Sequence, residues 1–371
     1  MGIPSRIRCH GGTRGVRCCG LAGGSRHQGG GAVNLVRKLR IDGFVLAILA
    51  TVAIASVLPA GAGFAPTLDT IVTAAIALLF FLYGARMHPR EALDGLKHWR
   101  LHTLILAFTF VLFPLVGIAL RVLEPSLLSA DLYTGVLYLT LVPSTVQSSI
   151  AFTSMARGNV AGAIVSASAS NLLGVLLTPL LVIAMASLHL LGTGGSIQIS
   201  ARAIVDICAQ LLVPFLVGQL ARPLIGAWVE KHSGSLKYVD RGSIVLVVYA
   251  AFSEGVREGI WHAVSAWQIG FLVLLSVLLV VVMLWLTGQC ADRLGFDCGN
   301  RIAVQFCGTK KSLASGLPMA AVLFAGQPVS IIVLPLMVFH QVQLMICSWL
   351  AARYGSQPAS ERSTTPLPTA R

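Results

Sequence analysis

Two adjacent lysines, Lys310 and Lys311, lie in the middle of a long apolar stretch, RIAVQFCGTKKSLASGLPMAAVLFA, which covers residues 301–325. If they marked a water boundary, the remaining helix over residues 312–325 would be about 21 Å long at 1.5 Å per residue. A hydrocarbon core of about 30 Å needs more. At least one lysine is therefore expected inside a bilayer, where a charge is costly unless it faces a cavity or a partner. We interpret Lys310 as the functional candidate and Lys311 as the more structural of the two.

A second group of polar residues begins at Pro143 in the sequence PSTVQSS and continues into the following apolar stretch. Pro143 removes a backbone donor and can break a helix, which would free carbonyl groups to bind an ion. Lipid offers no hydrogen bonds, so polar side chains at this depth must face protein or trapped water. The polar candidates of the two stretches are Ser144, Thr145, Gln147, Ser148, Ser149, Ser166, Ser168, Asn171, Gln305, Thr309 and Lys310.

The composition is that of a polytopic membrane protein. Of the 371 residues, 56% are hydrophobic and only 11% are charged, whereas soluble domains carry about 25% charged residues. The apolar stretches are continuous rather than alternating, which favours helices. The net charge of +13 is spread over short loops and the termini instead of one soluble face, so no nucleic-acid partner is expected. The scattered cysteines indicate neither a disulfide framework nor a zinc site.

The sequence predicts an all-α protein with ten transmembrane helices. An even number of spans puts both termini on one side of the membrane. Most lysines and arginines then fall on that side, and only Arg121, Arg202 and Arg257 fall on the other, so both termini are expected in the cytoplasm and the chain in the plasma (bacterial inner) membrane. The predicted spans are 42–62, 67–85, 101–122, 132–155, 160–187, 201–222, 241–260, 267–289, 301–325 and 328–352.

The polar groups lie in the fourth and ninth spans, which are corresponding places in two halves of five. Because five is odd, the halves would have opposite orientations, and interrupted helices at matching places of inverted halves indicate the substrate site of a secondary transporter. No G-x-x-x-x-G-K-[ST] nucleotide loop is present, so an ion gradient or the solute must supply the energy. A channel is less favoured, and an enzyme is not expected because no nucleophile–base pair is visible.

A simpler interpretation competes at each position. Serine and threonine often bond to their own helix or hold helices together, so any single serine is more often a packing residue than a ligand. This alternative weakens for the amides Gln147, Asn171 and Gln305, because a buried amide needs several partners. For Lys310 the alternative is a structural or snorkelling lysine.

Three blocks resemble the bile acid:sodium symporter family: LYGARMHPREALDGLKHWRLH, LVPSTVQSSIAFTSMARGNVAGAIVSASASNLLG and QFCGTKKSLASGLPMA. The resemblance covers residues 37–353 and is to the subgroup of bacterial members and the orphan seventh human sodium/bile-acid carrier. It implies two inverted five-helix repeats, with core and panel subdomains and with helices four and nine unwound where they cross. Sodium and an organic anion would bind at that crossing, near residues 144–149, 166, 168, 305, 309 and 310 of this chain.

The chain departs from sodium-dependent members in the ninth span. Gln305 stands where those members carry a glutamate, and Thr309 and Lys310 replace a Gln-Asn pair. An ammonium repels sodium by roughly 4 kcal/mol at about 4 Å and an effective dielectric of 20. Two couplings therefore stay open: sodium symport, or transport in which Lys310 replaces the bound cation or exchanges its own proton. No cofactor is expected, apart from Na⁺ in the first case.

The leading hypothesis is a secondary active transporter of a small organic anion, either bile-acid-like or another carboxylate or sulfate. The alternative is a non-transporting membrane regulator of ion or envelope homeostasis. Within this scheme residues 1–36 form a disordered basic extension, whose translation is itself open, residues 37–353 form the transporter domain, and residues 354–371 form a disordered cytoplasmic tail. The sequence does not indicate the solute or the oligomeric state.

Overall fold

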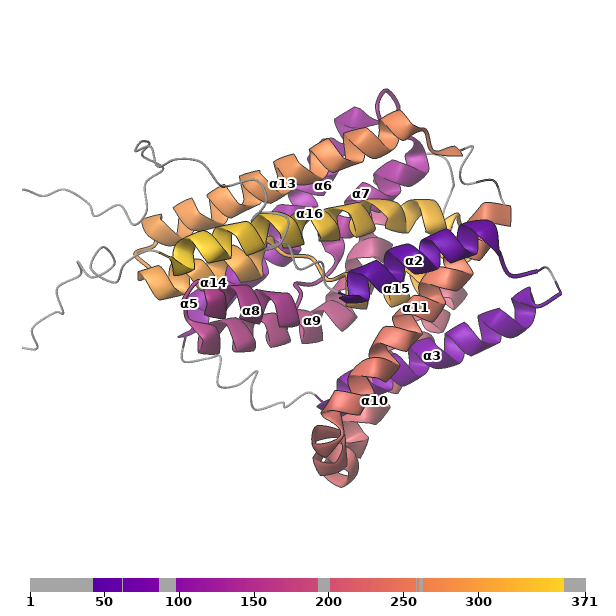
Figure 1. The fold of residues 1–371 in the computed structure, drawn as a ribbon, viewed down its shortest axis with the longest axis horizontal. Coiled ribbons are helices and arrows are strands. Elements are labelled where there is room, and N and C mark those ends of the chain that lie inside the picture. Colours follow the sequence, from indigo (N-terminus) through magenta and orange to yellow (C-terminus); the bar gives the residue numbers. More distant parts are fainter. Residues whose placement is uncertain are drawn as a thin grey trace, which may run out of the picture.

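The computed structural model describes residues 43–61, 63–86, 98–192, 201–257, 259 and 263–356, without the side chains of residues 45 and 201–209. Regular structure in these ranges is helical throughout, and six helices are long and apolar enough to cross a membrane (Figure 1). The chain is therefore an integral membrane protein, as the composition predicts. The predicted N-terminal extension, residues 1–36, lies outside the described residues, and so does the tail from residue 357.

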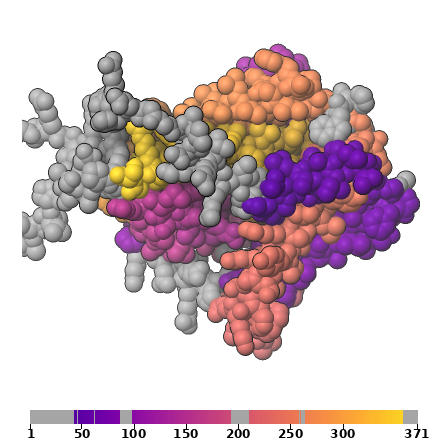
Figure 2. Space-filling view, in the orientation of Figure 1, coloured from indigo at the N-terminus to yellow at the C-terminus, as the bar shows by residue number. Residues whose placement is uncertain are grey.

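One group of helices packs as two pairs, α3 with α10 and α2 with α11. Gly84 and Gly218 let α3 and α10 approach closely, because a Cβ atom at Gly84 would overlap the carbonyl of Phe215 and one at Gly218 would overlap the carbonyl of Phe81. The hairpin between α10 and α11 projects from the body (Figure 2). The bounds are Gly43–Val57 for α2, Ala65–Arg86 for α3, Ala201–Lys231 for α10 and Ser233–Arg257 for α11.

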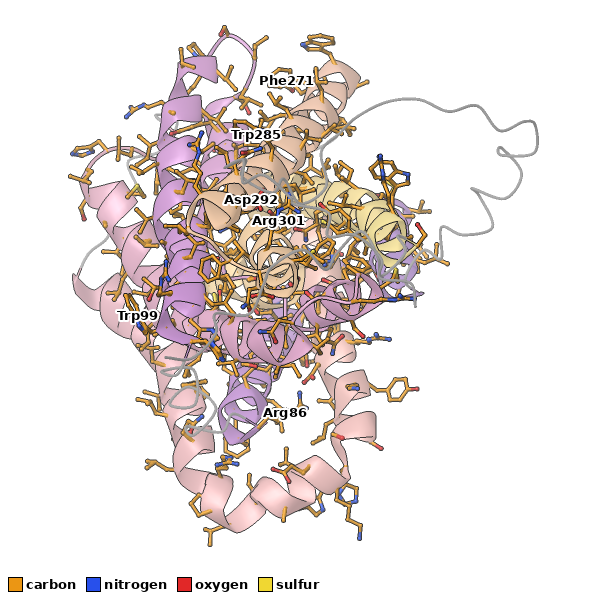
Figure 3. The ribbon with its side chains drawn as sticks, turned by 90° about the vertical axis from the view of Figure 1, so that its left-hand side faces the viewer. Arg86, Trp99, Phe271, Trp285, Asp292 and Arg301 are labelled. Carbon is orange, nitrogen blue, oxygen red and sulfur yellow. The ribbon has the colours of Figure 1, made fainter. Side chains whose placement is uncertain are left out.

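A second group surrounds α16 (Val329–Gly355), which packs against α7, α8, α13 and α15. The most apolar window of α16 is 61% buried, against 22–44% for the other long helices, so α16 is the central helix of the molecule (Figure 1). Trp99 and Trp285 lie on the outside and are 62% and 58% exposed, as expected of side chains that face lipid (Figure 3).

The span over residues 99–123 changes its helical pitch midway. It consists of α5 (Trp99–Ala107), the π-helical turn η2 (Phe108–Leu112), α6 (Phe113–Ala119) and the 3₁₀ turn η3 (Leu120–Leu123). Besides α16, the long uninterrupted helices of the second group are α9 (Val160–Ser187) and α13 (Ala266–Arg293).

Two of the predicted spans are interrupted helices. The fourth consists of α7 (Ala130–Leu141) and α8 (Gln147–Met155), and the ninth consists of α14 (Cys298–Thr309) and α15 (Leu313–Leu323). Val142 and Lys310 end the first helix of each pair in extended backbone conformations, with φ/ψ of −74°/153° and −86°/150°. The sequence predicted both interruptions, one at Pro143 and one beside the lysines.

Four of the ten predicted spans do not count among the six long apolar helices. The helix α2 has only 15 residues, α11 is not among the long apolar helices, and the fourth and ninth spans are each divided in two. The number of membrane crossings therefore stays a prediction.

Candidate functional site

The two interruptions are in direct contact. The amide of Ser312 donates a hydrogen bond of 2.8 Å to the carbonyl of Pro143. The hydroxyls of Ser144 and Ser149 donate to the carbonyls of Cys307 and Phe306, at 2.7 and 3.3 Å. Because α14 ends at Thr309, its last carbonyls lack helical donors. Serines from the first interruption thus satisfy carbonyls that the second one leaves free.

Lys311 is held by three backbone carbonyls. Its fully buried ammonium donates to Thr109, Thr140 and Val142 at 2.9, 2.7 and 2.9 Å, and it lies 4.3 Å from the ring centroid of Phe113. Thr140 lies in the last turn of α7, and Val142 follows its end, so both carbonyls are free of a helical donor. Lys311 thus stabilises these carbonyls, which fits the structural role predicted for it.

The third carbonyl, that of Thr109, is released by the π-helical turn. The amide of Phe113 donates to Phe108 instead of Thr109. The next residue is Pro114, which has no amide hydrogen to offer. A π-helical turn of this kind is rare and is often found at functional sites. The bond to Lys311 therefore depends on a local change of pitch in a different span.

The side chain of Gln343 on α16 fixes the peptide groups of Lys311. Its Oε1 accepts a hydrogen bond of 2.9 Å from the Lys311 amide, and its Nε2 donates one of 2.7 Å to the Lys311 carbonyl. The ring of His340 lies 2.8 Å from the same Nε2. The interruption between α14 and α15 is thus held in place by the central helix.

Lys310 has a different environment. It is fully buried, and its Nζ has no hydrogen-bond partner among the described residues. The ammonium lies 3.6 Å from the ring centroid of Phe152 on α8 and 5.9 Å from that of Phe306 on α14. A buried cation on aromatic faces, with no hydrogen-bond acceptor, would be stabilised by an anionic partner.

The hydroxyl groups after Pro143 form a short chain at the junction of the two interruptions. Thr145 bonds to Ser148 at 2.8 Å and to Ser149 at 3.4 Å. Gln147, the first residue of α8, is exposed. On α14, the hydroxyl of Thr309 lies 3.4 Å from that of Thr287. The predicted residues 144–149, 309 and 310 therefore lie around one junction, with Gln147 at its exposed edge.

Helix α9 contributes a second layer to the junction. Asn171 accepts a hydrogen bond of 2.7 Å from Ser315 on α15, and Ser170 accepts one of 3.1 Å from the amide of Ser144. Ser166 instead bonds to His102 on α5 at 2.7 Å, and Ser168 is half-buried. Asn171 thus ties α9 to α15, whereas Ser166 belongs to the contact with α5.

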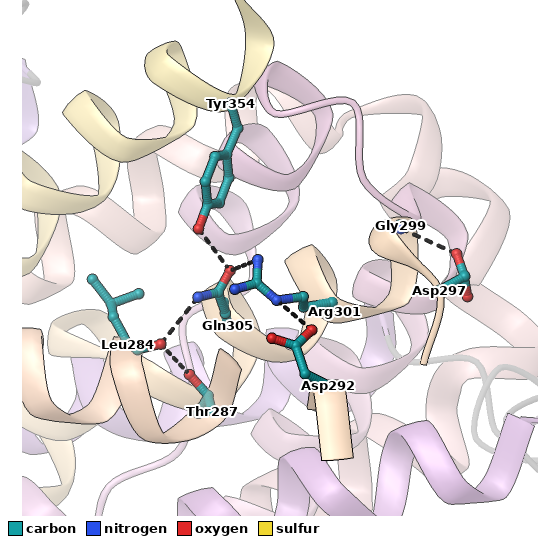
Figure 4. A network of polar contacts seen from close by, with 8 residues as sticks. All are labelled: Leu284, Thr287, Asp292, Asp297, Gly299, Arg301, Gln305 and Tyr354. Carbon is teal, nitrogen blue, oxygen red and sulfur yellow. Dashed lines mark hydrogen bonds and ion pairs between the residues drawn. The ribbon is translucent and has the colours of Figure 1, made fainter. Parts of the chain in front are cut away.

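Gln305 belongs to a separate polar network (Figure 4). Its Nε2 donates to the carbonyl of Leu284 at 3.0 Å, and its Oε1 accepts from Tyr354 at 3.1 Å and from Arg301 at 3.5 Å. Arg301 forms an ion pair of 2.8 Å with Asp292, beside which it lies in Figure 3. The amide of Gln305 therefore ties α14 to α13 and α16, and its role as an ion ligand stays a prediction.

Sequence reasoning missed several residues of the junction. Phe152 approaches Lys310 from α8, and nothing in its local sequence marks it. Gln343, which approaches Lys311 from α16, was predicted from the sequence only as a packing or cavity-lining residue. The carbonyls that bind Lys311 carry no side-chain signal at all. Pro114 was the one available indication, since it predicts an irregular turn just before it.

Comparison with known proteins identifies a transporter family. The model of the SBF-like CPA transporter family matches residues 42–356. An uncharacterised protein of Pseudomonas aeruginosa is 50% identical over 313 residues, which cover 84% of this chain and 92% of that one. YfeH of Escherichia coli, named as a candidate symporter, is 46% identical over 317 residues, 85% of this chain and 94% of its own.

A vertebrate relative extends the likeness. Sodium/bile acid cotransporter 7 of Xenopus tropicalis is 26% identical over 349 residues, which cover 90% of this chain and all of that one. The predicted resemblance to the bile acid:sodium symporter family, and to the branch of its seventh carrier, is confirmed. This chain belongs to the SBF-like CPA transporter family.

Proposed function

We propose that this protein is a secondary active transporter of a small organic anion, either bile-acid-like or another carboxylate or sulfate. The observation that carries the proposal is Lys310, a fully buried ammonium without a hydrogen-bond partner among the described residues, at the junction of two interrupted helices. The anionic group of a solute would supply the missing partner. Phe152 and Phe306 would then border the apolar part of the solute.

The proposal includes the finer architecture of the family. We expect ten membrane crossings in two inverted five-helix repeats, with α7–α8 as the fourth and α14–α15 as the ninth. In support, each of the ten predicted ranges contains helix, and the interruptions fall in the fourth and the ninth. We expect core and panel subdomains, with both termini in the cytoplasm of a bacterial inner membrane, because most basic residues lie on that side.

Two couplings are compatible with this site. Sodium symport would follow the name of the vertebrate relative. Proton coupling would follow from Lys310, because its charge is unfavourable in the empty site and favourable when an anion is bound. In the second case the solute anion and one proton would move together, with Lys310 carrying the proton.

Uptake into proteoliposomes tests the function. Purified protein would be given a panel of labelled carboxylates and sulfates, including bile acids, with and without a sodium gradient and a pH gradient. We expect accumulation of at least one anion, driven by one of the two gradients. Folded protein that moves none of the panel would contradict the proposal and favour the non-transporting regulator. A Lys310→Met variant in the same vesicles supplies the control for leakage.

A further inference from the structure

The environment of Lys311 resembles a cation site more than a salt bridge. We define the carbonyl cage as the backbone oxygens of Thr109, Thr140 and Val142, which lie 2.7–2.9 Å from the Lys311 ammonium. The face of Phe113 covers the same ammonium at 4.3 Å. None of the ion pairs in the described part of the chain includes Lys311. We infer that Lys311 is a tethered cation, whose ammonium fills a cage that would otherwise bind a free monovalent cation.

The chemistry of the cage supports this inference. Rings of backbone carbonyls are the ligands with which proteins replace the hydration shell of a monovalent cation, and an aromatic face adds further attraction. The three oxygens are available because their helices are interrupted. The π-helical turn frees the carbonyl of Thr109, and the end of α7 frees the carbonyls of Thr140 and Val142. An ammonium has three donors. The match in number leaves no oxygen of the cage without a partner.

The neighbouring lysine shows that burial alone does not create such a cage. Lys310 is equally buried, yet its Nζ has no carbonyl within hydrogen-bond reach among the described residues. The two lysines thus divide two tasks: Lys311 compensates the carbonyls of the interruption, and Lys310 is left to meet a ligand. The sequence suggested that Lys310 replaces a bound cation. The carbonyl cage indicates that Lys311 replaces it instead.

This inference deepens the proposed transport function. Only its consequence for cation release during transport rests on that function. If the charge in the cage is covalently attached, the cage itself needs no sodium, and it cannot release its cation during transport. The existence of the cage is tested without any transport measurement, so failure of one proposal is distinguishable from failure of the other.

The test is cation rescue of Lys311→Ala. Thermal unfolding in detergent would be followed in chloride salts of ammonium, methylammonium, potassium, sodium and N-methylglucamine at equal ionic strength. We expect a melting temperature about 5–10 °C below wild type in N-methylglucamine, since three charge-assisted bonds are lost. A small cation should recover a large part of this shift, because it binds only the folded cage. The matched control is Lys310→Ala, for which we expect no difference among the salts.

Two results would overturn the inference. One is a Lys311→Ala protein that is as stable as wild type in N-methylglucamine, or whose loss of stability no small cation reduces. The other is a sodium-specific stabilisation of the wild-type protein, relative to N-methylglucamine, that Lys311→Ala loses, because it would show that a free ion binds at the cage of the wild-type protein. If Lys311→Ala does not fold, Lys311→Met takes its place in both measurements.

Discussion

The amide of Ser312 and the carbonyl of Pro143 form a hydrogen bond of 2.8 Å between the two interrupted helices. Both residues lie between helices, so the amide of Ser312 and the carbonyl of Pro143 have no hydrogen-bond partner within a helix. The bond between them satisfies two backbone groups that would be costly to leave unpaired in a membrane. The same junction contains both lysines. A movement of either interrupted helix must therefore change the surroundings of Lys310.

Replacing Lys310 by methionine should separate stability from function. A buried charge without a hydrogen-bond partner contributes little or negatively to folding, and a hydrophobic side chain of similar volume is often neutral or stabilising by about 1–4 kcal/mol. We expect Lys310→Met to unfold at or above the wild-type temperature and to lose anion uptake. Uptake in proteoliposomes and thermal unfolding measure the two effects.

Lys311→Met is the matched control, because it is adjacent and equally buried. It leaves three carbonyls without a donor, so it should unfold at a lower temperature than Lys310→Met. Unchanged sodium-stimulated uptake in Lys310→Met would contradict the role given to Lys310.

The arrangement of the helices follows largely from hydrophobic runs and from proline. Pro143 removes an amide hydrogen and predicted the first interruption, and the second was predicted beside the lysines because the ninth span holds the place that matches the fourth. These signals are local, so they can be read from a single sequence. The division of the fourth and ninth spans agrees with these signals, whereas α2 is shorter than the span predicted over residues 42–62.

The division of labour between the lysines could not be predicted in the same way. The cage around Lys311 is made by backbone oxygens of residues 109, 140 and 142, which are distant in sequence and have no side-chain signature. The position of Gln305 was also beyond reach, because Leu284 and Tyr354 belong to other helices. Contacts that depend on how spans pack together need the folded structure.

Gln343→Leu should destabilise the interruption at Lys311. The substitution removes an acceptor for the Lys311 amide and a donor for its carbonyl, at 2.9 and 2.7 Å, and each unsatisfied buried group costs about 1–3 kcal/mol. We expect a loss of stability of about 2–4 kcal/mol in denaturant unfolding. Gln341→Leu is the control on the same helix, where the side chain is only half-buried and a change within about 0.5 kcal/mol is expected. Equal effects of the two variants would contradict this role for Gln343.

Gln305→Glu should not create sodium-stimulated uptake. A carboxylate at this position would face the Leu284 carbonyl, to which Gln305 now donates at 3.0 Å, and it would be drawn to the neighbouring Arg301. Arg301 would also repel a sodium ion placed there. Uptake of the transported anion with and without sodium, in wild type and variant, measures the outcome. A gain of sodium dependence in the variant would show that Gln305 lies at a cation site after all.

Gly84→Ala should weaken the packing of α3 on α10, whereas Gly242→Ala should not. A Cβ atom at Gly84 would overlap the carbonyl of Phe215, a backbone atom that can move only with its helix, and such overpacking costs about 1–3 kcal/mol. At Gly242 in α11 a Cβ atom meets nothing within 4 Å, and alanine is favoured over glycine inside a helix by up to about 1 kcal/mol. We therefore expect shifts of opposite sign in the melting temperature. If Gly84→Ala were as stable as wild type, the close approach of α3 and α10 would not be needed for the fold.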